Sequence, residues 1–237
     1  MQLIIFAGGF GTRISEETDF IPKPMVKIGK KPILWHIMRY YSFFGFEDFV
    51  ICGGYKINII RDYFYKNKNK FNWKIKVINT GKKSNTGERL KRVKKYIKNT
   101  FSLTYGDGLS NVNIYELINF HKKNKSVATL TTVRPIPHFG KITLKGDKVV
   151  KFYEKDQKKE SWINGGFFIC EKKIFNFINE KNSIFELDVL PKLAKKKKLS
   201  AYKHKDFWYC MDTLRDKRYL QKLWLSKKAP WKVWQDE

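Results

Sequence analysis

Short apolar runs alternate with amphipathic helical periods through the first half of this 237-residue chain. Each run has the usual length of a buried strand, and the stretches between the runs repeat apolar residues every three to four positions. Strands that alternate with helices form parallel sheets covered by helices. The pattern predicts a Rossmann-like three-layer sandwich with a mixed, mainly parallel central sheet, with strands at residues 3–6, 49–52, 75–78, 101–105 and 127–133.

Helix ends and one hairpin can also be placed from the residue pattern. Pro32 stands at the favoured first turn of a helix, and Gly45 ends that helix. Gly146 and Asp147 form a turn signal, which predicts a hairpin of residues 141–144 and 149–153. Further helical periods cover residues 90–97, 187–194 and 215–224, and the tryptophans of the final KAPWKVW should pack against the domain or a neighbouring subunit.

The length and the cysteines limit the class of protein. A chain of 237 residues is large enough for one domain with its own core. No apolar run approaches the ~20 residues needed to cross a bilayer, so we expect no membrane association. Cys52, Cys170 and Cys210 are widely separated and form no zinc-binding pair. They are typical of reduced packing residues in a cytoplasmic protein.

The net charge of +27 is the composition value that most needs interpretation. A balance of this size is what a nucleic-acid-binding protein would show. The lysines are, however, spread through every segment, and the run at residues 195–198 follows a helical segment as a solvated end. We therefore expect no nucleic-acid partner, although a basic nucleic-acid-binding protein is the alternative from another class. The positive field would still attract anionic nucleotides and sugar phosphates.

The first apolar run leads directly into a glycine-rich turn that ends in a cation, GGFGTR at residues 8–13. Glycines allow successive backbone N–H groups to converge on a polyanion without side chains between them. The spacing matches neither the P-loop nor the dinucleotide-binding fingerprint. Taken alone, the turn indicates either a phosphate site or a tight structural turn.

Lys23 stands between two prolines, Pro22 and Pro24. Because a proline disfavours helical conformation in the residue before it, we expect Lys23 on a stiff extended segment. A lysine held in this way can be directed at a phosphate.

These two motifs and the segments that follow them resemble the sugar-phosphate nucleotidyltransferases over nearly the whole chain. The segments that carry the resemblance are AGGFGTR, PKPMV, GKKPILWHIMRYYSFFG, DFVICGGYK, TGERLKRV, FSLTYGDGLS, WINGGFF, FWYCMDTLRDK and KAPWKVW. The resemblance is to members that make CDP-glucose and pyrophosphate from CTP and α-D-glucose 1-phosphate, for deoxysugar and surface-polysaccharide synthesis. It implies a homo-oligomer of single-domain subunits. Each subunit would have a nucleotide-binding half at about residues 1–134 and a sugar-binding half with a C-terminal helical segment at about residues 135–237.

The resemblance also implies roles for individual residues. Arg13 and Lys23 would be the catalytic cations, and Asp107 and Asp212 would hold Mg²⁺. By pattern alone, Asp107 in Gly-Asp-Gly is an ordinary turn residue and Asp212 before a threonine is an ordinary helix cap. The resemblance also implies that the loop at residues 86–89 closes on the nucleotide. The residues implied for the nucleotide are Ala7, Gly8, Gly9, Gly11, Thr12, Arg13, Ser84, Arg89 and Gly106, and those implied for the sugar are Gly140, Glu154, Asn164 and Gly165.

Two of these assignments compete with simpler interpretations. Arg89 by itself looks like one more cation on a basic helix, and Asn164 begins an Asn-Gly-Gly sequence that is equally typical of a turn. Transfer between two polyanions needs cations and a metal ion, but no general base, because the second pKa of a phosphate is about 6. None of the histidines, His36, His121, His138 and His204, shows metal-ligand spacing, and we assign them no role.

The chain departs from the family in three places. The segment between Tyr63 and Thr80 is shorter, which bears on the oligomer. On the sugar side, Glu154 is followed by Lys155-Asp156 in place of Lys-Pro, and residues 137–140 replace a longer Pro-Gly-Arg-Phe-Gly-like loop. These changes leave open a transferase that uses UTP or dTTP, or another phosphorylated acceptor. A nucleotide sensor without turnover is a further alternative.

Overall fold

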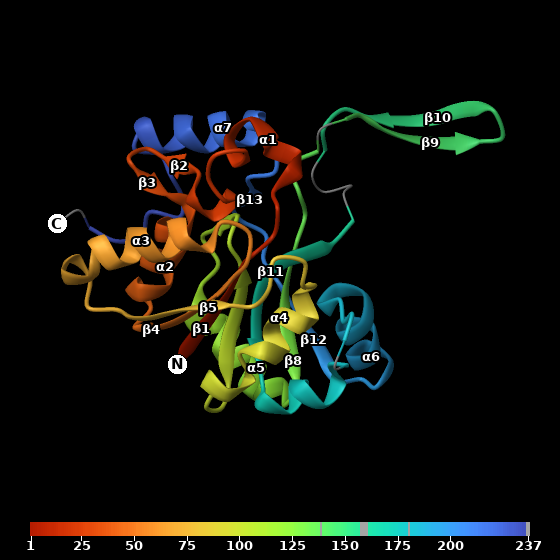
Figure 1. Cartoon of the computed structure of the whole chain (residues 1–237). Helices are drawn as coiled ribbons and strands as arrows, with labels where there is room; N and C mark the ends of the chain where they lie inside the picture. The colour runs from red at the N-terminus through yellow and green to blue at the C-terminus, as the bar shows by residue number, and fades with distance from the viewer. Residues whose placement is uncertain (138, 157–160, 180, 236–237) are drawn as a thin grey trace.

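The structure, a computed structural model, describes residues 1–137, 139–156, 161–179 and 181–235. His138 lies outside these ranges. The centre of the molecule is a seven-stranded sheet with the strand order β12-β8-β11-β6-β1-β4-β5 (Figure 1). Its strands are β1 (Gln2–Ala7), β4 (Asp48–Gly53), β5 (Lys74–Asn79), β6 (Phe101–Tyr105), β8 (Ala128–Val133), β11 (Ile163–Cys170) and β12 (Leu199–Lys203).

The sheet is mixed and mainly parallel, as predicted. β11 runs antiparallel to β6 and β8, whereas every other neighbouring pair in the sheet is parallel. All five expected strands are present. β11 was not among them, and the turn interpretation of Asn164-Gly165-Gly166 is wrong. These three residues lie inside β11. The pairing of β11 with β8 shifts register between Asn164 and Phe168, and Gly166 has a φ of +77°.

Strand β1 shows why these apolar runs are continuous. Leu3 and Ile5 point into one core, and Ile4 and Phe6 point into the other. All four side chains are buried. Because both faces of the sheet are covered, the strand has no polar face to expose.

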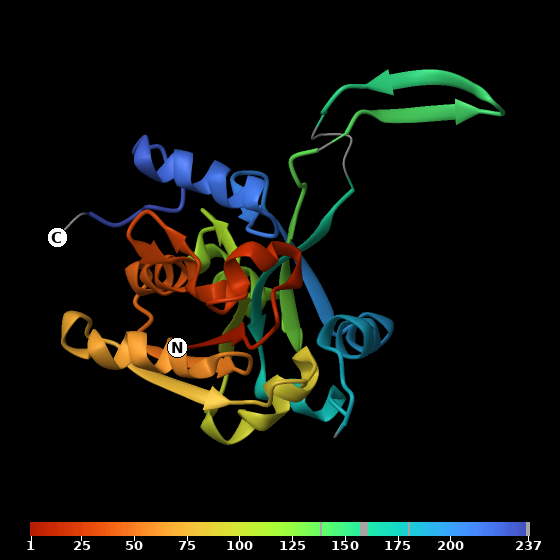
Figure 2. The same cartoon turned by 45° about the horizontal axis from the view of Figure 1, so that its top comes forward.

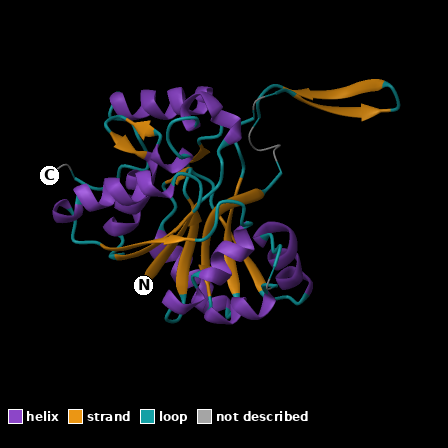
Figure 3. Ribbon diagram, in the orientation of Figure 1, coloured by secondary structure: helices purple, strands orange, loops and turns teal. Residues whose placement is uncertain are grey.

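Helices form the two outer layers (Figure 3). One core contains residues of α2 (Ile33–Phe43), α3 (Ile57–Lys66), α5 (Ile114–Asn124) and α7 (Leu214–Leu225). The other contains residues of α4 (Thr86–Arg92), the π-helix η7 (Phe185–Val189), α6 (Leu190–Lys195) and the 3-10 helix η6 (Lys172–Phe177). Another 3-10 helix, η4 (Lys94–Tyr96), continues from α4. No helix in the described ranges is long and apolar enough to cross a membrane.

The predicted helices are present, with small shifts at their ends. Pro32 lies one residue before α2 and not within its first turn, while Gly45 follows the helix with a φ of +80°. The helical period that starts at Leu90 begins earlier in the structure, because a capping box of Asn85 and Glu88 starts α4 at Thr86. The predicted packing of the C-terminal tryptophans against the domain is confirmed, since Trp231 and Trp234 are buried in the same core as α2 and α7.

The predicted hairpin of β9 (Lys141–Lys145) and β10 (Lys148–Tyr153) is present and extends away from the body (Figures 1 and 2). Its apolar side chains are exposed, with 58% of Leu144 and 63% of Phe152 accessible. The remaining short elements are η1 (Thr12–Ile14), α1 (Ser15–Thr18), η2 (Lys23–Met25), β2 (Lys27–Ile28), β3 (Lys31–Pro32), η3 (Lys68–Lys70), β7 (Gly108–Ser110) and β13 (Trp208–Cys210).

Candidate active site

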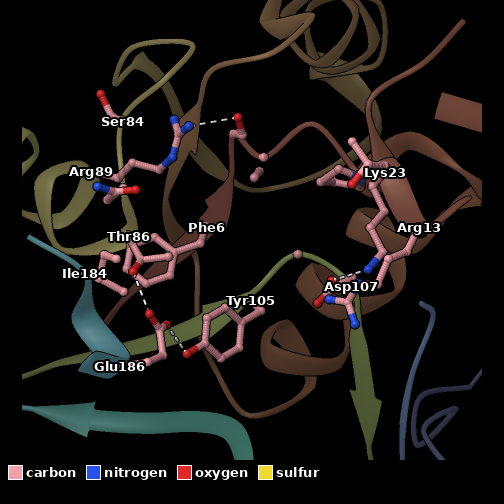
Figure 4. A pocket seen from close by; sticks show the side chains of 18 residues that line it. Phe6, Arg13, Lys23, Ser84, Thr86, Arg89, Tyr105, Asp107, Ile184 and Glu186 are labelled. Carbon is pink, nitrogen blue, oxygen red and sulfur yellow. Dashed lines mark hydrogen bonds and ion pairs between the residues drawn. The ribbon is translucent and has the colours of Figure 1, made fainter. Parts of the chain in front are cut away.

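A cavity of about 440 Å³ opens at the carboxyl ends of β1 and β6 (Figure 4). This end of parallel strands is where open α/β sheets bind ligands. The structure brings together at this cavity every residue predicted for the nucleotide and three of the four predicted catalytic or metal-binding residues. Its predicted lining residues are Ala7, Gly8, Gly9, Gly11, Thr12, Arg13, Lys23, Ser84, Arg89, Gly106 and Asp107.

The glycines of the first loop are needed for different reasons. A Cβ on Gly8 would lie 2.0 Å from Nη1 of Arg89, so Gly8 is required by the packing of that arginine. Gly11 has a φ of +71°, a left-handed conformation that other residues rarely adopt. A Cβ on Gly9 would have no neighbour within 4 Å. Only Gly9 therefore leaves open space over the backbone, as the prediction of a phosphate-binding loop requires.

Arg89 lies beneath this loop, with 4% of its surface exposed. Its Nη2 donates to the carbonyl oxygen of Gly8 at 2.9 Å, and its Nη1 donates to the carbonyl oxygen of Gly81 and to Thr80 Oγ1, each at 2.8 Å. The interpretation of Arg89 as a solvated cation on a basic helix is therefore wrong. Its guanidinium joins the first loop to the segment before α4 and fixes the spacing between these two walls of the cavity. Its contact with a bound nucleotide stays a prediction.

Lys23 is directed at two carboxylates, although its backbone conformation differs from the expected one. The prediction of an extended segment is wrong, because Lys23 is the first residue of the 3-10 turn η2 and Pro24 is the second. Its side chain is buried, and Nζ donates to Asp107 Oδ2 at 2.7 Å and to Asp212 Oδ1 at 2.6 Å. Burial works against the charged form, but Asp107 and the hydrogen bonds to both aspartates outweigh it and raise the pKa of Lys23.

Asp107 and Asp212 come from distant parts of the chain and meet at one cation. Asp212 also accepts a hydrogen bond from Nη1 of Arg13 at 2.8 Å. The helix-cap interpretation of Asp212 is wrong, because Thr213 caps α7 and Asp216 completes the capping box. The carboxylate of Asp212 is therefore directed toward the site and away from the helix end.

The two aspartates fit a hard divalent cation. One ligand atom from each of Asp107, Cys210 and Asp212 lies within 4.8 Å of the others. Mg²⁺ is commonly held by one or two carboxylates together with substrate phosphates. Burial, followed by the charge of Asp107, raises the pKa of the Cys210 thiol. Mg²⁺ takes oxygen ligands in preference to sulfur, so the carboxylate oxygens are the donors that fit. No sequence signal had pointed to Cys210.

The residues predicted for the sugar are not all at the cavity. Gly140 and Glu154 lie together at the base of the hairpin and are not among the residues that line the cavity. Asn164 is beside the cavity, where its Nδ2 donates to the hydroxyl of Tyr105 at 3.4 Å. The carbonyl oxygen of Gly165 accepts from the indole of Trp208 at 2.6 Å. Binding of the sugar by these four residues stays a prediction.

One wall of the cavity contains Glu186, a carboxylate that was not predicted from the sequence. Glu186 accepts hydrogen bonds there from Thr86 Oγ1 at 2.6 Å and from the hydroxyl of Tyr105 (Figure 4). Thr86 begins the loop at residues 86–89 that the resemblance places at the nucleotide, and Tyr105 lies inside the motif TYGDG, which could have suggested it. Nothing around Glu186 marks it. The cavity-lining residues that the sequence did not indicate are Phe6, Pro24, Asn85, Tyr105, Ile184 and Glu186.

The fold and this site define a class of protein. The chain belongs to the nucleotidyl transferase family, whose model matches residues 2–236. It is similar to the glucose-1-phosphate cytidylyltransferase of Salmonella typhimurium, with 42% identity over 99% of this chain and 100% of that protein. It is also 32% identical to the D-glycero-alpha-D-manno-heptose 1-phosphate guanylyltransferase of Campylobacter jejuni, over 88% of this chain and 93% of that protein. The solved structure of HddC from Yersinia pseudotuberculosis is 27% identical with a TM-score of 0.74, covering 94% of this chain and 99% of that chain.

Proposed function

We propose that this chain is a glucose-1-phosphate cytidylyltransferase. It transfers the cytidylyl group of CTP to α-D-glucose 1-phosphate in a Mg²⁺-dependent reaction, giving CDP-glucose and pyrophosphate for deoxysugar and surface-polysaccharide synthesis. The observation that supports this most strongly is the junction of Lys23, Asp107 and Asp212 beside the glycine loop. The full-length similarity to the Salmonella enzyme favours cytidine and glucose over other substrate pairs.

The chemistry assigned to the chain follows from the charges at the site. The attacking phosphate oxygen is already ionised near neutral pH, so the enzyme does not need a base. It needs cations that bring two polyanions together and stabilise charge on the leaving pyrophosphate. Lys23 is buried, charged and fixed by two carboxylates, which suits it to the reacting phosphates. Arg13, with 72% of its side chain exposed, lines the cavity while it bonds Asp212, and we assign it to the departing pyrophosphate.

Asp107 and Asp212 are the residues that would hold Mg²⁺. The metal ion would supply positive charge for the phosphates of both substrates. In the described structure Nζ of Lys23 lies between the two carboxylates, within 2.7 Å of an oxygen of each. This arrangement keeps two acidic groups close together before a substrate binds, because the ammonium balances their charge.

The exposed hairpin supports the proposal that the enzyme is a homo-oligomer. Ile142, Leu144, Val149, Val150 and Phe152 are each about half or more exposed. A monomer rarely leaves so many neighbouring apolar side chains in water. We propose that the hairpin contacts another copy, in a cytoplasm where Cys52 and Cys170 stay reduced. Light scattering should then show a smaller assembly when Leu144 and Val149 are replaced by serine.

The proposed reaction is tested by measuring pyrophosphate release with each nucleoside triphosphate and a panel of sugar 1-phosphates. We expect release with CTP and glucose 1-phosphate in the presence of Mg²⁺, and none after EDTA is added. A UTP or dTTP preference, or a different acceptor, would replace the substrate pair and keep the enzyme class. Absence of release with every pair, together with nucleic-acid binding that weakens steeply with salt, would favour the non-catalytic alternative.

A further inference from the structure

Glu186, which was not predicted from the sequence, is the centre of a hydrogen-bond network along one wall of the cavity. The amide of Asn164 donates to the hydroxyl of Tyr105, and this hydroxyl donates to Oε1 of Glu186. Oε2 of Glu186 accepts from Oγ1 of Thr86 at 2.6 Å. This hydrogen-bond network therefore joins β11, β6, η7 and α4, four elements on one side of the cavity.

The donor and the acceptor of each hydrogen bond in this network can be assigned. Thr86 Oγ1 accepts the backbone N–H of Phe185 at 2.9 Å, so its own proton is given to Glu186. Burial, followed by the charge of Glu186, raises the pKa of Tyr105, so its phenol keeps the proton that it donates. Glu186 is consequently an acceptor only, and an ionised carboxylate can accept more than the two bonds it receives here.

Glu186 has no cationic partner among the residues that the structure describes. Its carboxylate lines the cavity on the side away from Lys23 and Asp107, the side that also carries Thr86 and Ile184 (Figure 4). A phosphate would be repelled by this carboxylate, so the phosphates belong at the Lys23 end. The group that fits against Glu186 is an uncharged hydrogen-bond donor.

We propose that Glu186 is a specificity-determining residue that accepts a hydrogen bond from a hydroxyl of the acceptor sugar, with Tyr105 and Thr86 as positioning residues that hold its carboxylate. This inference rests on the proposed function. A sugar hydroxyl is favoured over a phosphate of the nucleotide, because the carboxylate of Glu186 would repel a phosphate. A donor of the nucleoside is the competing partner, and the KM for CTP distinguishes the two.

The test compares Glu186→Ala and Glu186→Gln with the wild type in steady-state kinetics. We expect Glu186→Ala to raise the KM for glucose 1-phosphate by about 10- to 100-fold, the usual effect of losing a hydrogen bond to a charged group, with the KM for CTP within about threefold of wild type. Glu186→Gln keeps an acceptor oxygen, so its KM for glucose 1-phosphate should lie between those of the wild type and Glu186→Ala. Glu116→Gln is a matched control, because Glu116 accepts from the hydroxyl of Tyr202 at 2.8 Å and does not line the cavity.

Monodeoxy glucose 1-phosphates then identify the hydroxyl. The wild type should discriminate against one of them, and Glu186→Ala should accept that analogue and glucose 1-phosphate about equally well. An increase in the KM for CTP, or the same discrimination among sugars in wild type and Glu186→Ala, would overturn the inference. If the wild type itself does not turn over CTP with glucose 1-phosphate, the proposed function fails instead, and the two failures are thereby distinct. Thermal unfolding of each variant separates a folding defect from lost recognition.

Discussion

His36 makes the stability of this protein depend on pH in a way that can be calculated. Its imidazole has no exposed surface and lies against Trp224 at a ring-centroid distance of 4.5 Å. Nε2 is 2.9 Å from the carbonyl oxygen of Ile28, which can only accept, so Nε2 carries the proton. Nδ1 accepts from the indole of Trp231 at 3.4 Å. The native structure therefore holds one neutral tautomer, and protonating Nδ1 would remove the acceptor that Trp231 uses.

Burial is the main reason that the pKa of His36 falls from 6.5 to about 4, with the carbonyl of Ile28 acting in the opposite direction. Between these two values the unfolded chain binds a proton that the folded chain does not bind. The free energy of unfolding must therefore decrease as the pH falls through this window. At about 1.4 kcal/mol per pH unit, the difference amounts to about 3 kcal/mol. This contribution is fully present above pH 6.5 and is lost as the pH approaches 4.

Urea unfolding followed by tryptophan fluorescence at several pH values measures this effect. Carboxylates titrate in the same range, so the informative quantity is the difference between wild type and His36→Gln, which keeps a donor for Ile28 but cannot be protonated. We expect the variant to lose about 3 kcal/mol less than wild type between pH 7 and pH 4. Equal pH dependence in the two proteins, with unchanged m-values, would refute the argument that the buried ring resists protonation.

Other predictions concern the site itself. Lys23→Ala should lower turnover by at least about 100-fold in a pyrophosphate-release assay, with an unchanged circular dichroism spectrum, and wild-type turnover would remove Lys23 from the reaction. Asp107→Asn should move the Mg²⁺ titration of activity to at least about tenfold higher concentration, whereas an unaltered titration would exclude it as a ligand. Gly8→Ala should lower the unfolding free energy by about 1–3 kcal/mol, because its Cβ would lie 2.0 Å from Nη1 of Arg89. Gly9→Ala, with no neighbour within 4 Å, should leave the fold stable and serves as the control.

Local patterns predicted much of the fold because the signal for each element lies within its own residues. The apolar runs gave five of the seven strands of the central sheet, and Gly45 and Gly146 marked a helix end and a hairpin turn where the backbone has positive φ. β11 was missed because Gly166 interrupts its apolar run at a bulge, and an isolated Asn-Gly-Gly sequence does not distinguish a bulge from a turn.

The site was only partly predictable because its walls come from distant segments. The loop with its three glycines and the prolines around Lys23 are local signals, and the resemblance added the two aspartates. Nothing local shows that Thr86 and Glu186, 100 positions apart, share a hydrogen bond, or that Asp212 faces Lys23 across 189 positions. Such contacts depend on the crossover connections of the sheet, which the residue pattern does not specify.

Arg89 shows how far one buried cation can determine the sequence around it. Its guanidinium contacts the carbonyl oxygens of Gly8, Gly53 and Gly81, and it occupies the space in which a Cβ of Gly8 or Gly54 would lie. The glycine at position 8 is thus required by an arginine 81 positions away and not by its own backbone angles. A positive charge beneath the loop also adds to the field that attracts phosphates above it. The same residue therefore accounts for the close approach of the two walls and for part of the electrostatics of the cavity between them.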